Sequence, residues 1–307
     1  MIALLLMKQI AVLFLTMLCG FILVKSKLLK AESSKTLSVI CIYILMPCVV
    51  INSFQIEYSS SIRNGFLLAV LAAIIIHIVL LFLTWVLGRF LKLNVVEKTS
   101  LIYSNAGNLV IPLVMAVLGN EWVIYANAFL CVQLLILWTH GQSLMEQKVQ
   151  FNWKKIIHNV NLIAVLIGII LFFTQIKMPE IVGTTMSNLS ATLGPVSMMM
   201  LGMTMAQIEW KKVFLDTRIY IITILKMIVC PAVILLILKF SPLSTLVPNG
   251  QTILLISLIA VITPSATTVV QLAQLYDQEP SYASSINVLT TIVCIVTMPL
   301  MVMLYLK

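Results

Sequence analysis

Two polar stretches that contain proline interrupt a chain that is otherwise strongly apolar. They are Asn105-Ala-Gly-Asn108-Leu-Val-Ile-Pro112 and Ile262-Thr263-Pro264-Ser265-Ala-Thr267-Thr268. Amide and hydroxyl side chains can hydrogen-bond a small ligand, and a proline frees backbone carbonyls in the preceding turn. In a bilayer every backbone polar group needs a partner, so broken backbone occurs only where it lines a cavity within the protein. Two such breaks in corresponding halves of a chain are typical of a central binding site between two repeats.

The polar side chains of these stretches are the candidate ligands of a substrate. Asn105, Asn108 and Pro112 are spaced to share roughly one face of a helix. If both helices unwind and cross, their half-helix N-termini present N–H groups and partial positive charge, which suit a carboxylate. Alternatively, both helices are only kinked, and their Asn and Thr side chains join them to neighbouring helices. The candidate substrate-binding residues, including two that follow Pro47, are Asn52, Ser53, Asn105, Asn108, Pro112, Thr263, Pro264 and Ser265.

Three further polar residues lie inside apolar runs and are candidates for an ion or proton support site. Lys226 is costly at the middle of a membrane helix, by at least ~2.5 kcal/mol. We expect it near the crossing point, where its charge would attract an anion or replace a sodium ion; the alternative is that it extends to the membrane surface. His77 titrates near physiological pH and could relay a proton, or be a neutral packing residue. Gln133 is a weaker polar candidate.

Composition indicates a polytopic membrane protein. Hydrophobic residues make up 61% of the 307 residues and charged residues only 9%, whereas soluble domains carry about 25% charged residues. The net charge of +9 is therefore interpreted as membrane topology and not as affinity for nucleic acid. The sequence contains no nucleotide-binding loop, metal-ligand cluster or nucleophile motif, so we expect no cofactor, no metal and no enzyme activity. The six cysteines are expected to be packing residues in helices.

Ten apolar runs are long enough to cross a bilayer as helices. Their approximate residues are 4–24, 35–54, 66–88, 98–118, 121–139, 158–175, 180–206, 218–239, 250–275 and 281–306. The longest polar gap between them, 140–157, is predicted to be a linker. The chain is thus divided into 1–139, the linker 140–157, and 158–307.

The two halves share landmarks in the same order. Pro47 corresponds to Pro195, His77 to Lys226, and the stretch around Pro112 to that around Pro264, each pair separated by about 150 residues. This spacing predicts a five-helix unit used twice. Because five is odd, the second copy must be inverted across the membrane. The predicted fold is all-α, with ten membrane helices in two inverted repeats and crossing, broken fourth and ninth helices.

Lysine and arginine gather in the loops that follow odd-numbered helices. These loops lie at 25–35, 89–98, 148–155 and 211–218. The positive-inside rule assigns them to the cytoplasm and places both termini outside a multi-pass protein of the plasma membrane.

The motifs in their order resemble those of the auxin efflux carrier family. The resemblance rests on Leu45-Met-Pro47, Asn105-Ala-Gly-Asn108 through Pro112-Leu, Leu225-Lys226, Pro231 and Thr263-Pro264-Ser-Ala, and it extends over essentially the whole chain. It implies an elevator-like carrier with an NhaA-like or bile-acid-transporter-like fold. In that scheme, helices one, two, six and seven form a scaffold, and helices three to five and eight to ten form a transport domain.

The short linker points to the bacterial malate or malonate permease branch of that family and away from the plant PIN branch. The resemblance implies substrate ligands at Asn105 and Asn108 and a support residue at Lys226, and it makes a homodimer plausible. Val110 departs from the family, where a glycine is usual at that position.

The leading hypothesis is secondary transport of a small organic anion, such as a mono- or dicarboxylate. Glu and Asp residues lie near the ends of the predicted spans, so no carboxylate pair is available as an obvious buried proton or sodium site. This favours a substrate that is itself negative. The alternatives are a receptor that binds an anion without moving it, or a channel. The partners expected are the anion and the lipid bilayer.

Overall fold

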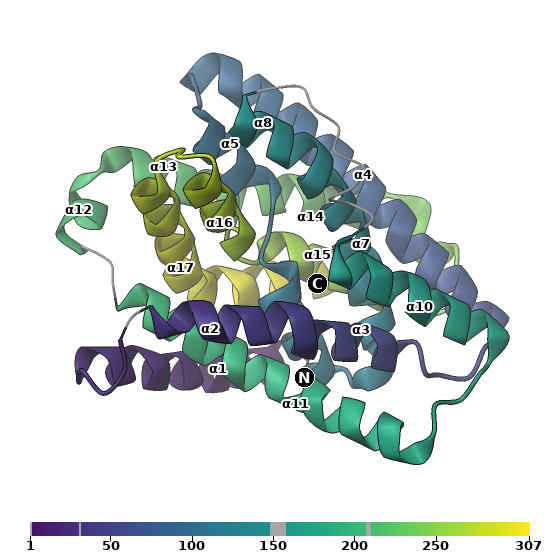
Figure 1. Ribbon diagram of the computed structural model, residues 1–307. Helices are drawn as coiled ribbons and strands as arrows, with labels where there is room; N and C mark the ends of the chain where they lie inside the picture. The colour runs from purple at the N-terminus through teal and green to yellow at the C-terminus, as the bar shows by residue number, and fades with distance from the viewer. Residues whose placement is uncertain (1, 31, 148–157, 207–209) are drawn as a thin grey trace. The chain divides into compact units, whose positions relative to one another are not determined.

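The structure is a computed structural model that describes residues 2–30, 32–147, 158–206 and 210–307 (Figure 1). Within these ranges the secondary structure is helical, and the only β-type pairing is one isolated bridge. Most of the predicted linker, including Lys148, Lys154 and Lys155, lies outside the described residues.

Six of the described helical spans are long and apolar enough to cross a membrane. They are Lys8–Lys25, Ser33–Ser53, Ser60–Leu91, Asn120–Glu146, Thr217–Phe240 and Pro280–Leu306, and three shorter apolar helices are Ala106–Val117, Val160–Thr174 and Gly250–Ile262. Large apolar side chains such as Leu15, Phe82 and Leu166 are exposed, as is usual for helices that face lipid. The chain is therefore an all-helical, multi-pass membrane protein. The count of ten spans and their inversion stay predictions.

The chain forms two compact units, each assembled from three segments. Unit 1 comprises Met1–Arg63, Gly107–Asn127 and Lys154–Ile208, and unit 2 comprises Asn64–Ala106, Ala128–Trp153 and Glu209–Lys307. Each predicted repeat contributes to both units, because the units are defined by contacts in space and not by chain order.

Unit 1 contains helices that are adjacent in space but far apart in sequence. In Figure 1, α1 (purple) lies along α11 (green). Glycines permit this close approach: a Cβ atom at Gly20 or Gly202 would lie closer than 3.0 Å to backbone atoms of Met199 or Met17. Small residues at such crossings let membrane helices pack by van der Waals contact. The helices of unit 1 are α1 (Ile2–Lys25), α2 (Ser33–Ile40), α3 (Met46–Ser53), α6 (Ile111–Val117), α10 (Val160–Thr174) and α11 (Glu180–Met205).

Replacement of Gly202 by alanine is expected to lower stability by about 1–3 kcal/mol, because the new methyl group would force α1 and α11 apart. Gly183→Ala is the matched control on the same helix, since nothing lies within 4 Å of its Cβ position. That control should gain up to about 1 kcal/mol from helix propensity. Thermal unfolding in detergent measures both, and equal midpoints for the two variants would contradict the close crossing.

Unit 2 contains most of the remaining helices. In Figure 1, α13, α16 and α17 lie together, and contacts join α17 to both of the others. The first residues of α4 and α7 belong to unit 1. The helices are α4 (Ser60–Leu91), α5 (Val95–Ile102), α7 (Val123–Ile136), α8 (Gln142–Glu146), α12 (Trp210–Leu215), α13 (Thr217–Ile224), α14 (Cys230–Phe240), α15 (Gly250–Ile262), α16 (Thr267–Leu275) and α17 (Pro280–Leu306).

Three prolines are each preceded by a five-residue π-helical turn. Pro47, Pro112 and Pro231 are each the second residue of the α-helix that follows such a turn. The turns are Cys41–Leu45, Ala106–Val110 and Leu225–Val229. A proline lacks the N–H that an α-helix would use and clashes with the previous turn, so a wider turn before it relieves both problems. Lys226 lies within one of these turns.

Candidate functional site

The fourth and ninth predicted spans are both interrupted, and the two breaks pair with each other inside unit 2. Ser104 and Ser265 form an antiparallel bridge. The Asn105 N–H donates to the carbonyl of Pro264 at 2.9 Å, and the Ala266 N–H donates to the carbonyl of Tyr103 at 3.0 Å. We call these two segments, Tyr103–Asn105 and Thr263–Ala266, the crossover.

This geometry corrects the expected position of the first break. Asn105 lies outside the helices, immediately before the π-helical turn Ala106–Val110, so Asn105, Asn108 and Pro112 do not share one helical face. The break was expected at Pro112, but the π-helical turn Ala106–Val110 accommodates that proline within the helix. The unwound residues, Tyr103–Asn105, come before this turn. At the second break the expectation was close, because α15 ends at Ile262, immediately before Thr263 and Pro264. The ninth of the predicted spans, 250–275, is therefore two helices, α15 and α16.

Side chains from two other helices complete the hydrogen bonds of the crossover. Gln133 on α7 accepts from the Ser104 N–H at 3.0 Å and donates to the Ser104 carbonyl at 2.8 Å. Asn287 on α17 donates to the Ser265 carbonyl at 2.6 Å, and the Thr290 hydroxyl accepts from the Ser265 N–H at 3.3 Å. Gln133 was anticipated as a weak candidate. Asn287 and Thr290 were not anticipated, although both are polar residues in an apolar span.

Lys226 points into the crossover and is only 1% exposed. Its ammonium donates to the Ser104 hydroxyl at 2.8 Å and to the carbonyl of Leu101 at 3.2 Å. Leu101 is in the last turn of α5, where free carbonyls carry partial negative charge. Both partners are neutral, and among the described residues no carboxylate forms an ion pair with this lysine. This burial does not fit the alternative, in which Lys226 extends to the membrane surface.

Two buried polar atoms of the crossover have no hydrogen-bond partner among the described residues. They are the amide nitrogen Nδ2 of Asn105, a residue 3% exposed, and the hydroxyl of Ser265, a residue 0% exposed. Thr263 differs, because its hydroxyl donates to the carbonyl of Ala260 at 2.7 Å. A buried polar group left unpaired costs about 1–3 kcal/mol, so these two atoms require an explanation.

His77 lies on α4 and is buried in unit 2. Its Nδ1 is 2.7 Å from the carbonyl of Ala73, and its ring centroid is 5.0 Å from that of Phe129. Its Nε2 has no partner among the described residues. A role for His77 in proton support stays a prediction.

The remaining candidates belong to unit 1 and have partners there. The Ser53 hydroxyl donates to the carbonyl of Val50 at 2.7 Å and accepts from the amide of Asn127. The backbone carbonyl of Asn52 accepts from the Gln55 N–H at 3.1 Å. The carbonyl of Asn108 accepts from the Ser197 hydroxyl at 3.0 Å.

Pro112 packs over Gly194, since a Cβ atom at Gly194 would lie 3.1 Å from the Pro112 ring. The contact joins the start of α6 to the middle of α11, next to Pro195.

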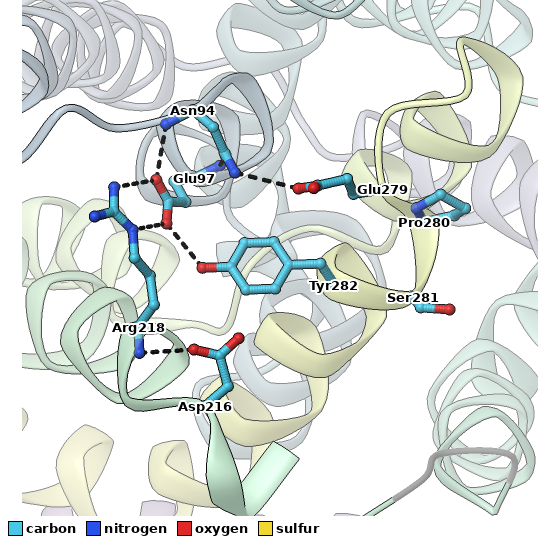
Figure 2. Close-up of a pocket in the computed structure, with 8 residues that line it drawn as sticks. All are labelled: Asn94, Glu97, Asp216, Arg218, Glu279, Pro280, Ser281 and Tyr282. Carbon is cyan, nitrogen blue, oxygen red and sulfur yellow. Dashed lines mark hydrogen bonds and ion pairs between the residues drawn. The ribbon is translucent and has the colours of Figure 1, made fainter. Parts of the chain in front are cut away.

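A cavity of about 580 Å³ lies elsewhere in unit 2, at the N-terminal ends of three helices (Figure 2). Its lining residues are Asn94, Glu97, Asp216, Arg218, Glu279, Pro280, Ser281 and Tyr282. Glu97 accepts hydrogen bonds from Arg218 Nε at 2.5 Å, from Arg218 Nη2 at 2.9 Å and from the Tyr282 hydroxyl at 2.8 Å. Since these partners already occupy the carboxylate, the cavity wall is a structural cluster, which we call the Glu97–Arg218 cluster.

The Glu97–Arg218 cluster joins the ends of four helices. Glu97 and Asn94 form a capping box at the start of α5. Arg218, at the start of α13, also donates to the carbonyls of Leu91 and Lys92 at the end of α4, at 3.0 Å each. Tyr282 adds the start of α17. Burial tends to raise the pKa of Glu97, but the hydrogen bonds from Arg218, the Asn94 N–H and Tyr282 outweigh it and lower that pKa.

The described part of the chain contains neither a metal-ligand cluster nor a disulfide. No group of three or more His, Cys, Asp or Glu side chains there could hold a metal ion. All six cysteines are free, and Cys41, Cys230 and Cys294 are buried in helices.

The sequence is similar to a known protein family. The sequence model of a family described as membrane transport protein matches residues 5–152 and 147–302, which together span nearly the whole chain. No curated protein matches the chain significantly.

Proposed function

The chain belongs to the membrane transport protein family, and on this basis we propose that it is a secondary transporter that moves a small organic anion across the plasma membrane. The substrate class is a mono- or dicarboxylate. One observation carries the proposal: the crossover presents two buried, unpaired polar atoms, Asn105 Nδ2 and Ser265 Oγ. An amide nitrogen can only donate and a hydroxyl can donate, so both suit the oxygens of a carboxylate.

Electrostatics supports an anion over a neutral or cationic ligand. Lys226 places an ammonium beside Ser104, and no carboxylate among the described residues pairs with it. The N-terminus of α16 also begins at the crossover, and its N-cap residue Ala266 supplies no side-chain cap. A helix N-terminus carries partial positive charge. All these features favour negative charge and belong to the same unit.

The composition of the units supports an elevator-type cycle. Unit 2 holds most of the third, fifth, eighth, ninth and tenth predicted spans and the first part of the fourth. The resemblance to auxin efflux carriers assigns these spans to the mobile transport domain. We propose that unit 2 carries the crossover during transport and that unit 1 is the scaffold, in a protein of the malate or malonate permease type. Homodimerisation through the scaffold is part of this proposal.

Binding of carboxylates to the purified protein tests the site directly. A ligand that binds only the folded state raises the melting temperature by mass action. We expect mono- or dicarboxylates to do so, and Asn105→Ala to weaken the binding about tenfold, since hydrogen bonds to charged groups contribute about 1.5–3 kcal/mol. Ser285→Ala on α17, which removes an exposed hydroxyl, is the control and should bind normally.

If no carboxylate raises the melting temperature, or if Asn105→Ala leaves the rise unchanged, an anion site at the crossover is contradicted. Counterflow of labelled carboxylate in vesicles then separates a carrier from a receptor or a channel, because only a carrier exchanges bound substrate across the membrane. Normal binding without counterflow would favour the receptor.

A further inference from the structure

The central residues of the crossover have backbone groups that the crossover itself cannot satisfy. In an antiparallel pair flanked by hydrogen bonds, the N–H and C=O of the two facing residues point outward. Ser104 and Ser265 are this pair, because the flanking bonds run between Asn105 and Pro264 and between Ala266 and Tyr103. Four outward groups on these two buried residues therefore need partners. The Ser104 carbonyl also accepts from the Ala106 N–H at 2.8 Å, so the Ser104 N–H and the two groups of Ser265 are the ones that depend on side chains.

Three side chains supply these four partners. Gln133 forms both bonds with Ser104, so its amide reproduces the contacts that a further strand would make. Asn287 and Thr290 divide the same task for Ser265. Gln133 is 3% exposed, Asn287 is 3% exposed and Thr290 is 0% exposed, so water does not compete for these bonds.

The two sets lie on corresponding elements. Gln133 is on α7, in the fifth predicted span, and Asn287 and Thr290 are on α17, in the tenth. Each unwound segment is thus held by the last helix of its own predicted repeat. Asn105 is adjacent to the supported pair and Ser265 belongs to it, so the support also acts on the two residues that carry the unpaired polar atoms.

We propose that Gln133, Asn287 and Thr290 are positioning residues: they replace the missing strand neighbours of the crossover and so hold Asn105 and Ser265 in binding geometry. This inference rests on the proposed function for its effect on substrate, but its effect on the backbone is independent of any ligand. Loss of one bond should open the crossover locally and leave the surrounding helices folded.

Backbone hydrogen exchange, measured by mass spectrometry on the full-length protein in detergent without ligand, tests the backbone effect. Thr290→Val keeps the shape of the side chain but removes the acceptor for the Ser265 N–H, and exchange in a peptide covering 263–267 should rise about tenfold. Thr290→Ser keeps a hydroxyl and should restore slow exchange. Unchanged exchange in Thr290→Val would overturn the proposal.

Gln133→Leu applies the same test to the other segment, through peptides covering 103–106. Gln142→Leu is the matched control, because Gln142 is also a buried glutamine of the Asn120–Glu146 span but bonds to Glu146. Only the Gln133 variant should accelerate exchange at the crossover. Equal acceleration in both would indicate general loosening and would contradict a positioning role. If Gln133→Leu does not fold, the comparison of Thr290→Val with Thr290→Ser tests the proposal by itself.

Carboxylate binding to the purified protein and carboxylate uptake into proteoliposomes give the second set of measurements. The positioning variants should raise the apparent KM for the carboxylate about tenfold, with the maximal rate per folded protein little changed. If exchange accelerates but no carboxylate binds even the parent protein, the positioning role stands and the proposed function fails. If carboxylates bind the parent and every folded positioning variant equally, the positioning role fails and the proposed function stands.

Discussion

Lys226→Gln is expected to abolish most carboxylate transport while leaving the protein at least as stable as the parent. At a separation of about 8 Å and an effective dielectric constant of about 20, an ammonium attracts a carboxylate by ~2 kcal/mol, about 30-fold in affinity. Stability should not fall, because the ammonium is buried against the neutral oxygens of Leu101 and Ser104. Removal of a buried, unpaired charge relieves a desolvation cost.

The combination of lost transport and retained stability distinguishes a functional charge from a structural one. Lys239→Gln is the matched control: it removes the same charge from an exposed lysine in the same Thr217–Phe240 span, whose ammonium contacts the carbonyl of Leu304. Uptake into proteoliposomes and thermal unfolding provide the two measurements. Normal transport by Lys226→Gln, or a large loss of stability, would contradict the role assigned to this lysine.

Glu97→Gln is expected to produce the largest loss of stability, about 3 kcal/mol. The carboxylate of Glu97 is fully buried, whereas the side chain of Arg218 is 42% exposed. Removal of one partner of a buried pair costs about 3–5 kcal/mol, and the partial exposure of Arg218 places this pair near the lower limit. Glu279→Gln is the control, because the side chain of Glu279 forms a long, exposed hydrogen bond to Asn94 at 3.3 Å. Equal melting temperatures for the two variants would contradict the importance of the Glu97–Arg218 cluster.

The same residue predicts a pH dependence of stability. Glu97 precedes the fourth predicted span, and its pKa in the folded protein lies below its usual value of 4.5. A depressed carboxyl pKa means that the stabilisation is complete above the unfolded pKa and is lost as the pH falls through the folded pKa. Below pH 4.5 the parent should therefore lose stability more steeply than Glu97→Gln.

The sequence was sufficient to predict features that depend on one residue with a high energetic cost in a membrane. Lys226 was predicted to be functional because a charged residue inside an apolar run is energetically costly. The second break was predicted because Pro264 lies among residues with hydroxyl side chains. The first break was predicted too far along the chain. That prediction rested on Pro112, and the sequence alone does not indicate that a π-helical turn will accommodate this proline.

Long-range partners were less accessible to prediction. Asn287 and Thr290 resemble ordinary helix-packing residues until the crossover is placed beside them. Glu97 and Arg218 lie at the ends of separate spans, and their pairing depends on how those helices assemble. The two units likewise follow from contacts between distant segments, whereas repeats are visible as order along the chain.

Among the described residues no carboxylate neutralises Lys226, so the steps of the proposed transport cycle should depend on the membrane voltage. A site that carries this ammonium is positive when empty, neutral with a monocarboxylate and negative with a dicarboxylate. Each elementary charge that crosses a potential of 100 mV changes its energy by about 2.3 kcal/mol. With a negative interior, the voltage would draw the empty site inward and drive the dicarboxylate-loaded site outward. Export of dianions would then be electrogenic and accelerated by the membrane potential in both half-cycles, whereas the loaded step of a monoanion would be insensitive to voltage.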